Sequence, residues 1–265
     1  MALFPCILHL MFIDTHSHFD DAAFDADRDA CWARARAVGV EAQVLPAVSR
    51  ASWPKLKVVA ASDAHLHPAY GLHPMLLAEH ASGDLEALEA WIEQERPVAV
   101  GECGLDYFVP GLDPDAQWHF FTGQLALARQ FGLPVIIHAR RAVDQVAKAL
   151  RLNPGIRGVV HSFSGSEQQA RTLIDLGCLL GIGGPVTYPR AQRLRRLVAT
   201  LPLEAILLET DAPDQPSVEH RGERNEPAFL PEIAAEIARL RDMEIEALAE
   251  ATTRNARRLF ALPEP

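Results

Sequence analysis

The sequence lacks the basic character of proteins that hold nucleic acid mainly through its phosphates. Its 25 lysines and arginines are outnumbered by 35 aspartates and glutamates, which gives a formal net charge of −10 at pH 7. Proteins that depend on many phosphate contacts usually present a basic face. Any polyanionic substrate must therefore be held locally, by metal ions and a few arginines.

Paired cysteines are also missing. The four cysteines form no CxxC pair and no zinc-knuckle spacing, and they lie far apart at Cys6, Cys31, Cys103 and Cys178. Scattered thiols without a secretory signal are typical of reduced cysteines in the cytoplasm. We therefore expect a cytoplasmic protein without disulfides.

No long apolar run is present either. The apolar segment 1–12 has neither the basic start nor the cleavage site of a signal peptide, and it is too short to cross a membrane. Met11 stands directly before the first expected strand. We interpret residues 1–10 as an N-terminal extension or a mis-assigned start, and residues 11–265 as one domain without a membrane partner.

What the sequence does contain is a regular alternation of short apolar runs and amphipathic segments. The eight runs predict parallel strands, at residues 11–15, 42–48, 69–72, 98–101, 135–137, 158–160, 179–183 and 205–208. The segments between and after them predict helices, at residues 26–38, 53–62, 84–95, 115–131, 143–150, 166–176, 190–199, 230–240 and 245–260. Eight strands close a barrel, and 265 residues are near the roughly 250 typical of one.

The predicted fold class is therefore an α/β (β/α)₈ TIM barrel with a single domain. A doubly wound open sheet is the alternative, but no glycine-rich phosphate loop follows the first strand. The longest loop, residues 212–227, is expected to form a wall of the site.

Side chains with metal-binding chemistry follow the predicted strands, where a barrel of this kind places its active site. A lone buried histidine is more often a satisfied core residue than a ligand, and a lone acid is often a helix cap. Their joint placement at strand ends favours a site, because nothing in those ordinary roles explains such clustering. The residues are His16, His18, His73, Glu102, His138, His161 and Asp211.

Their spacing suggests two divalent ions per chain. His16 and His18 face the same side of a strand and can hold one ion. Glu102 has two oxygens and can bridge two ions, His138 and His161 can complete the second, and Asp211 closes the ring beside the first strand. Mixed histidine and carboxylate sets suit Zn²⁺, Mn²⁺ or similar ions, and Mg²⁺ is a further candidate.

Two neighbouring patterns serve as controls. His65 and His67 have the same spacing as the first pair but precede strand three, so we expect them in a solvated loop at the opposite end of the barrel. Cys103 follows Glu102 directly and should point away from the ions, because side chains alternate along a strand.

The motifs around these residues resemble the TatD family of metal-dependent deoxyribonucleases, within the amidohydrolase superfamily. The similar segments cover essentially the whole chain and are FIDTHSHFD (12–20), YGLHP (70–74), VGECGLDYF (100–108), PVIIHAR (134–140), VVHSFSG (159–165), LLETDAP (207–213) and RNEP (224–227). One departure is the loop after Asp211, which places Asp214 near the site where many members carry an aromatic residue and a leucine.

The resemblance implies a binuclear site that hydrolyses phosphodiester bonds in DNA from the 3′ end. His16, His18 and Asp211 would hold one ion and His138 and His161 the other, with Glu102 bridging. His73 would contact the substrate phosphate, and Arg140 would pair with phosphate oxygens at the mouth.

A mechanism follows from these groups. A bound divalent ion lowers the pKa of water from 15.7 towards about 7, and Asp211 is the best candidate for the general base. Glu102 and His73 complete the expected catalytic set.

Two other functions stay open. One is a metal-dependent hydrolase of a small-molecule amide, lactone or phosphoester, which the acidic charge favours slightly. The other is a non-catalytic binding protein on a barrel scaffold. The expected partner is DNA or another phosphodiester, and a monomer is compatible with the sequence.

Overall fold

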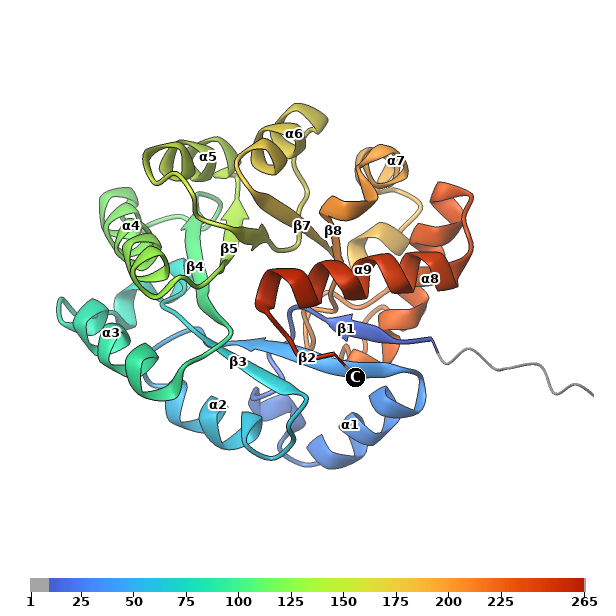
Figure 1. Cartoon of the computed structure of the whole chain (residues 1–265), viewed down its shortest axis with the longest axis horizontal. Helices are drawn as coiled ribbons and strands as arrows, with labels where there is room; N and C mark the ends of the chain where they lie inside the picture. The colour runs from blue at the N-terminus through green and yellow to red at the C-terminus, as the bar shows by residue number, and fades with distance from the viewer. Residues whose placement is uncertain (1–9, 265) are drawn as a thin grey trace, which may run out of the picture.

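Eight parallel strands form one sheet that curves into a nearly closed barrel, which confirms the predicted fold class (Figure 1). The computed structural model describes residues 10–264. Each strand pairs with the next one along the chain, and the backbone N–H of Thr15 donates to Leu208 O at 3.0 Å to link the two ends of the sheet. The strands are β1 (Phe12–Asp14), β2 (Val40–Pro46), β3 (Leu66–Tyr70), β4 (Ala99–Asp106), β5 (Val135–Arg140), β6 (Gly158–Val160), β7 (Cys178–Ile182) and β8 (Ile206–Leu208).

Helices surround the barrel, and two of them follow the last strand (Figure 1). Their amphipathic pattern is local, so the sequence places them closely, and the predicted bounds of α3 and α9 agree with the structure. The helices are α1 (Arg28–Ala37), α2 (Trp53–Ala60), α3 (Asp84–Glu95), α4 (Pro114–Phe131), α5 (Val143–Leu152), α6 (Glu167–Asp175), α7 (Gln192–Thr200), α8 (Leu230–Arg241) and α9 (Ile245–Phe260).

An apolar cluster fills the end of the barrel where the strands begin. Nearly every strand contributes to it, with Ile13, Ala42, Val44, Ala69, Ala99, Ile136, Val159 and Leu207. Helix α9 closes this end, because Ala256, Leu259 and Phe260 belong to the same cluster. The Asn255 side chain fixes α9 there by donating to Leu203 O and Ile206 O at 2.9 and 3.0 Å. The interior of the barrel is therefore open to polar side chains only at the opposite end.

Strand β4 is longer than the sequence predicts, and this corrects the position of Glu102. The predicted run ended at residue 101, whereas β4 continues to Asp106, so Glu102 lies inside the strand. Backbone pairing with β5 extends from Cys103 to Asp106, although this stretch contains a glycine and an aspartate and is not a continuous apolar run. The register of the pairing shifts between Val100 and Cys103. Glu102 sits at this shift. Cys103 is buried in the core as predicted.

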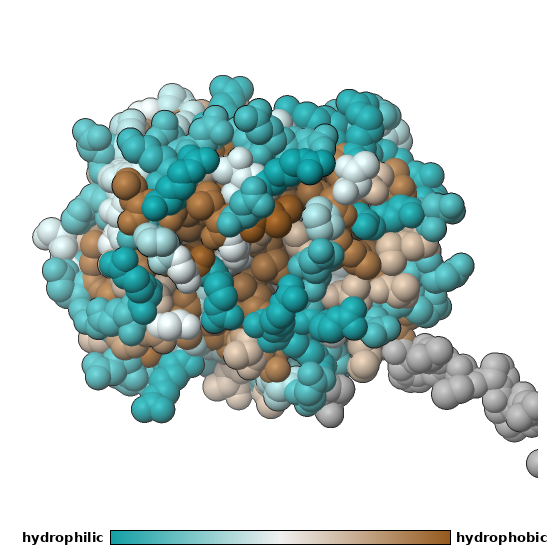
Figure 2. Space-filling model, turned by 45° about the horizontal axis from the view of Figure 1, so that its top comes forward, coloured by the Kyte–Doolittle hydropathy of each residue, from teal (hydrophilic) through white to brown (hydrophobic). Residues whose placement is uncertain are grey.

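Hydrophilic side chains cover most of the face shown in Figure 2, with apolar side chains visible between them. Within residues 10–264, no helix has the length and apolar character needed to cross a membrane. Cys31, Cys103 and Cys178 are buried free thiols. Cys6 and most of the predicted extension at residues 1–10 lie outside the described residues.

Candidate metal centre

Glu102 lies at the middle of the predicted cluster and faces two sets of imidazole nitrogens. Its Oε2 is 3.2 Å from His16 Nε2 and 3.6 Å from His18 Nε2. Its Oε1 is 3.2 Å from His138 Nδ1 and 2.8 Å from His161 Nε2. The structure therefore brings all five residues together, with one carboxylate oxygen toward each pair of rings.

Asp211 joins the pair that follows β1. Its Oδ1 is 3.5 Å from the Nε2 atoms of both His16 and His18, which are 3.4 Å apart. Donor atoms about 2.0–2.2 Å from one tetrahedral ion lie about 3.3–3.6 Å from one another. The observed spacing of these donors thus fits a common ion.

Hydrogen bonds on the outer side of two rings leave their inner nitrogens free to act as ligands. His18 Nδ1 donates to Pro46 O at 3.3 Å, so its Nε2 presents a lone pair to the cluster. His138 Nε2 donates to Asp106 Oδ2 at 2.8 Å, so its Nδ1 does the same. A second hydrogen bond of this kind is typical of metal-binding histidines.

His73 differs from these two rings because its protonated nitrogen faces the cluster. Its Nδ1 accepts a hydrogen bond from the backbone N–H of Met75 at 3.2 Å, so the proton resides on Nε2, which donates to Glu102 Oε1 at 3.0 Å. An N–H directed into the cluster suits a hydrogen-bond donor to an anion better than a metal ligand. This geometry supports the role in substrate binding that the sequence suggested.

The charges of the cluster fit a cation. Burial alone would lower the pKa of His161, yet the negative charges of Glu102, Asp211 and Glu209 raise it to about 10. Burial and the neighbouring charge of His161 lower the pKa of His16 to about 4. The carboxylates around His161 thus favour positive charge at the cluster. Histidine nitrogens and carboxylate oxygens are suitable donors for a divalent ion.

Asp14 aligns the ends of β1 and β8. Its Oδ1 accepts from the backbone N–H groups of His16 and Thr210, and its Oδ2 accepts from the Thr210 hydroxyl at 2.6 Å. The backbone N–H of Asp211 in turn donates to His16 O at 2.8 Å. Two residues of the cluster are thereby held next to each other. Burial raises the pKa of Asp14 to about 7.

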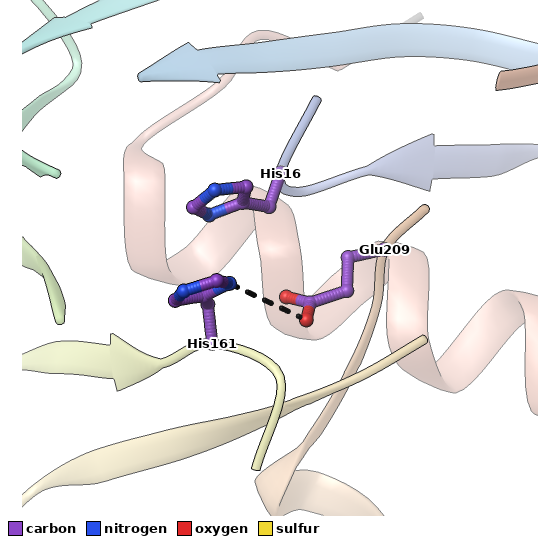
Figure 3. A group of neighbouring side chains, drawn as sticks. All are labelled: His16, His161 and Glu209. Atoms are coloured by element: carbon purple, nitrogen blue, oxygen red, sulfur yellow. Dashed lines mark ion pairs between the residues drawn. The ribbon is translucent and has the colours of Figure 1, made fainter. Parts of the chain in front are cut away.

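Two buried acids beside the cluster were not identified from the sequence. Asp106 fixes His138, and its pKa falls to about 2 because hydrogen bonds from His138 and from two backbone N–H groups outweigh the effect of burial. Glu209 lies beside the stacked rings of His16 and His161, with its Oε1 3.8 Å from His161 Nδ1 (Figure 3). The signal for Glu209 was its place two residues before Asp211 in the LLETD segment.

Glycine makes room for Glu209. A Cβ at Gly181 of β7 would collide with the Glu209 carboxylate. Glu209 Oε1 accepts from the backbone N–H of Ser162 at 2.5 Å, whereas its Oε2 and the Nδ1 atoms of both rings have no hydrogen-bond partner within the described chain. Burial raises the pKa of Glu209 to about 8.

The cluster opens into a cavity of about 680 Å³. The predicted substrate ligand Arg140 lines it, as do Asp214 and Gln215 of the loop after β8, so this loop forms a wall as expected. The Gln215 side-chain amide donates to Asp211 Oδ2, which leaves Oδ1 directed toward the histidines. Asn225 secures the loop by donating to Thr210 O and Asp214 O at 2.8 and 2.7 Å.

Comparison with known proteins agrees with this arrangement. The family model described as TatD related DNase matches residues 13–261. The chain belongs to the TatD family. A curated TatD relative, the uncharacterized metal-dependent hydrolase YjjV of Escherichia coli K12, is 41% identical over 258 residues, which cover 95% of this chain and 98% of the relative.

Other TatD proteins match over similar lengths. A protein of Erwinia tasmaniensis named 3′-5′ ssDNA/RNA exonuclease TatD is 36% identical, over 90% of this chain and 95% of that protein. The crystal structure of the E. coli YjjV protein has a TM-score of 0.92 at 39% identity, covering 97% of this chain and 100% of that one. The predicted family and the prediction of a metal-dependent hydrolase are confirmed.

Proposed function

We propose that this TatD protein hydrolyses phosphodiester bonds of single-stranded DNA or RNA from the 3′ end, with two divalent ions per chain. The observation that carries the proposal is the division of the cluster about Glu102, whose two oxygens face separate pairs of histidines. The relative from Erwinia tasmaniensis, which bears the name of a 3′-5′ exonuclease, supports this substrate class.

The donor atoms divide into two sets. His16, His18 and Asp211 would hold one ion, His138 and His161 the other, and Glu102 would contribute one oxygen to each. Divalent ions held there would supply Lewis acidity, which makes water acidic enough to attack at neutral pH and neutralises charge on a phosphate. Zn²⁺, Mn²⁺ and Mg²⁺ are the candidates.

Side chains of the protein would accept the proton of the attacking water and orient the substrate phosphate. Asp211 has one oxygen engaged by Gln215 and the other directed into the cluster, where it can accept a proton from the attacking water. The His73 Nε2–H points toward the same space and can donate to a phosphate oxygen. Arg140 lines the cavity and can pair with another one.

The proposal is tested by supplying the protein with Zn²⁺, Mn²⁺ or Mg²⁺ after chelation and adding end-labelled DNA and RNA, single-stranded and duplex. We expect stepwise shortening of single strands from the 3′ end, and no shortening in chelator. Glu102→Gln, purified in parallel, controls for contaminating nucleases.

Small amides, lactones and phosphoesters are assayed beside the oligonucleotides. Turnover of one of these without any cleavage of nucleic acid would replace the proposal by that of a small-molecule hydrolase. The cytoplasmic location and the monomeric state expected from the sequence stay predictions.

A further inference from the structure

The rim of the cavity is divided by charge. On the side of β4 to β7 it carries Arg140, which lines the cavity, Arg141, which follows it, and Arg193, which donates to the cavity residue Ser164 at 2.6 Å. On the side of β8 it carries Asp214. The arginines on the side of β4 to β7 therefore attract a polyanion that reaches the cluster, whereas Asp214 on the side of β8 repels it.

The arginines on the attractive side are available to a ligand. Within residues 10–264, Arg140, Arg141 and Arg193 form no ion pair with a carboxylate. By contrast, Arg34 of α1 and Arg224 of the loop after β8 are both paired with Asp27 and Glu226, for example at 2.8 Å between Arg34 and Glu226.

An exposed aromatic ring lies beneath two of these arginines. The guanidinium carbon of Arg140 is 3.7 Å from the centroid of the Phe108 ring, and that of Arg141 is 4.7 Å from it. Phe108 is nevertheless 44% exposed, and the adjacent Tyr107 is 36% exposed. A phenyl ring this exposed, in contact with an arginine that lines the cavity, adds little to stability, but its flat surface can contact a planar group.

The position of the ring is coupled to the cluster through one carboxylate. Asp106 accepts from the backbone N–H of Phe108 at 2.8 Å with Oδ1 and from His138 Nε2 at 2.8 Å with Oδ2. Arg140 lies on β5 two residues after His138. The ring, the guanidinium and one imidazole of the cluster are thus held in a fixed relation.

We propose that Phe108, with Arg140 and Arg141 stacked on it, forms the platform on which one nucleobase of a single-stranded nucleic acid stacks while the scissile phosphate lies at the metal cluster. Every base has a flat π-face, so such stacking tolerates any sequence, and guanidinium groups add stacking surface and phosphate contacts. The strand leaves the cluster over β4 and β5. This inference rests on the proposed nuclease function and assigns its base-binding site.

Oligonucleotides with one abasic position, moved stepwise from the 3′ end, test the platform directly. For the wild type we expect kcat/KM to fall by about 5- to 50-fold when one particular base is missing, and to fall much less at distant positions. Phe108→Ala should lose a similar factor on the intact strand and show no further loss at that abasic position. Phe108→Trp should restore both the rate and the sensitivity.

Two controls separate stacking from disturbance of the fold. Leu152→Ala removes another exposed apolar side chain, 64% exposed, at the end of α5 and outside the lining of the cavity, and should leave kcat/KM unchanged. The metal content and thermal unfolding of Phe108→Ala should equal those of the wild type, because alanine keeps the backbone N–H that Asp106 binds.

Each outcome decides between the two proposals. If Phe108→Ala cleaves intact and abasic strands as the wild type does, the platform is wrong and the nuclease function stands. If the wild type neither cleaves these strands nor binds a fluorescent oligonucleotide in an anisotropy titration, the nuclease function fails and the platform with it. Loss of metal in Phe108→Ala would also overturn the platform, because the ring would then act through His138.

Discussion

Two histidine pairs with identical spacing lie at opposite ends of the barrel and have different surroundings. His16 and His18 follow β1, and their Nε2 atoms meet Glu102 and Asp211. His65 precedes β3 with its side chain 51% exposed, and its Nδ1 is 2.8 Å from Asp63 Oδ1. His67 lies within β3 and is half-buried, which corrects the expectation that both residues belong to a loop.

The difference teaches that strand direction, more than spacing, decides whether two histidines can share an ion. All eight strands are parallel, so the segments that follow them meet at one rim and supply several donors to one point. At the other end, His65 forms a hydrogen bond with the carboxylate of Asp63, two residues earlier. The pKa of His67 is lowered, mainly because its side chain is partly buried.

The sharpest test of this comparison disrupts one histidine of the first pair and removes both histidines of the second. His16→Ala should reduce hydrolysis by more than about a thousandfold, because an ion that loses a ligand no longer activates water efficiently. His65→Ala combined with His67→Ala should leave kcat/KM nearly unchanged. Initial rates and metal content of the three proteins are measured together, and equal losses would contradict the assigned strand directions.

Asp211→Asn tests the proposed proton acceptor at the end of the barrel that holds the cluster. We expect kcat to fall by about 10²- to 10³-fold with KM little changed, because an amide oxygen can still ligate weakly but cannot accept a proton. Asp214→Asn, three residues later in the same loop, should change kcat little. A parallel loss of one ion in Asp211→Asn would assign Asp211 as a ligand only, and near wild-type kcat would remove it from the mechanism.

The two ends also contain matching histidine–aspartate contacts, which allow a milder comparison. His138 and Asp106 are 2.8 Å apart, as are His65 and Asp63. Asp106→Asn should weaken metal binding by about 10- to 100-fold, whereas Asp63→Asn should not change it. Calorimetric titration of both variants with Zn²⁺ gives the affinities, and equal values would show that Asp106 has no influence on the ion.

The smallest expected effect concerns stability. An ion at a hundred times its Kd adds about 2.7 kcal/mol to the free energy of unfolding, which raises Tm by several degrees in a chain of this size. The wild type and the His65/His67 double variant should gain this increase, and Glu102→Gln should gain much less. Thermal scans with and without metal measure it, and a full increase in Glu102→Gln would place the ion elsewhere.

Much of the fold and the cluster could be predicted because both depend on repeated local patterns. The helices α3 and α9 begin and end where their amphipathic patterns do. Strand ends were less accurate, because pairing with neighbours extends β4 past its apolar run to Asp106. Asp106 was missed because a buried carboxylate that holds a histidine has no signature until the fold brings the two together. Glu209 was missed although its place two residues before Asp211 puts both side chains on the same side of the chain.

Helix α9 has a consequence for how the protein is made. It closes the apolar end of the barrel with Leu259 and Phe260, yet it is synthesised after all eight strands. If the strands pair before it emerges from the ribosome, the apolar floor that includes Leu207 and Val159 is left without its cover. A nascent barrel with every residue of the cluster already translated would therefore still be open at its base, and we expect a chain that ends before α9 to be a target for chaperones and proteases.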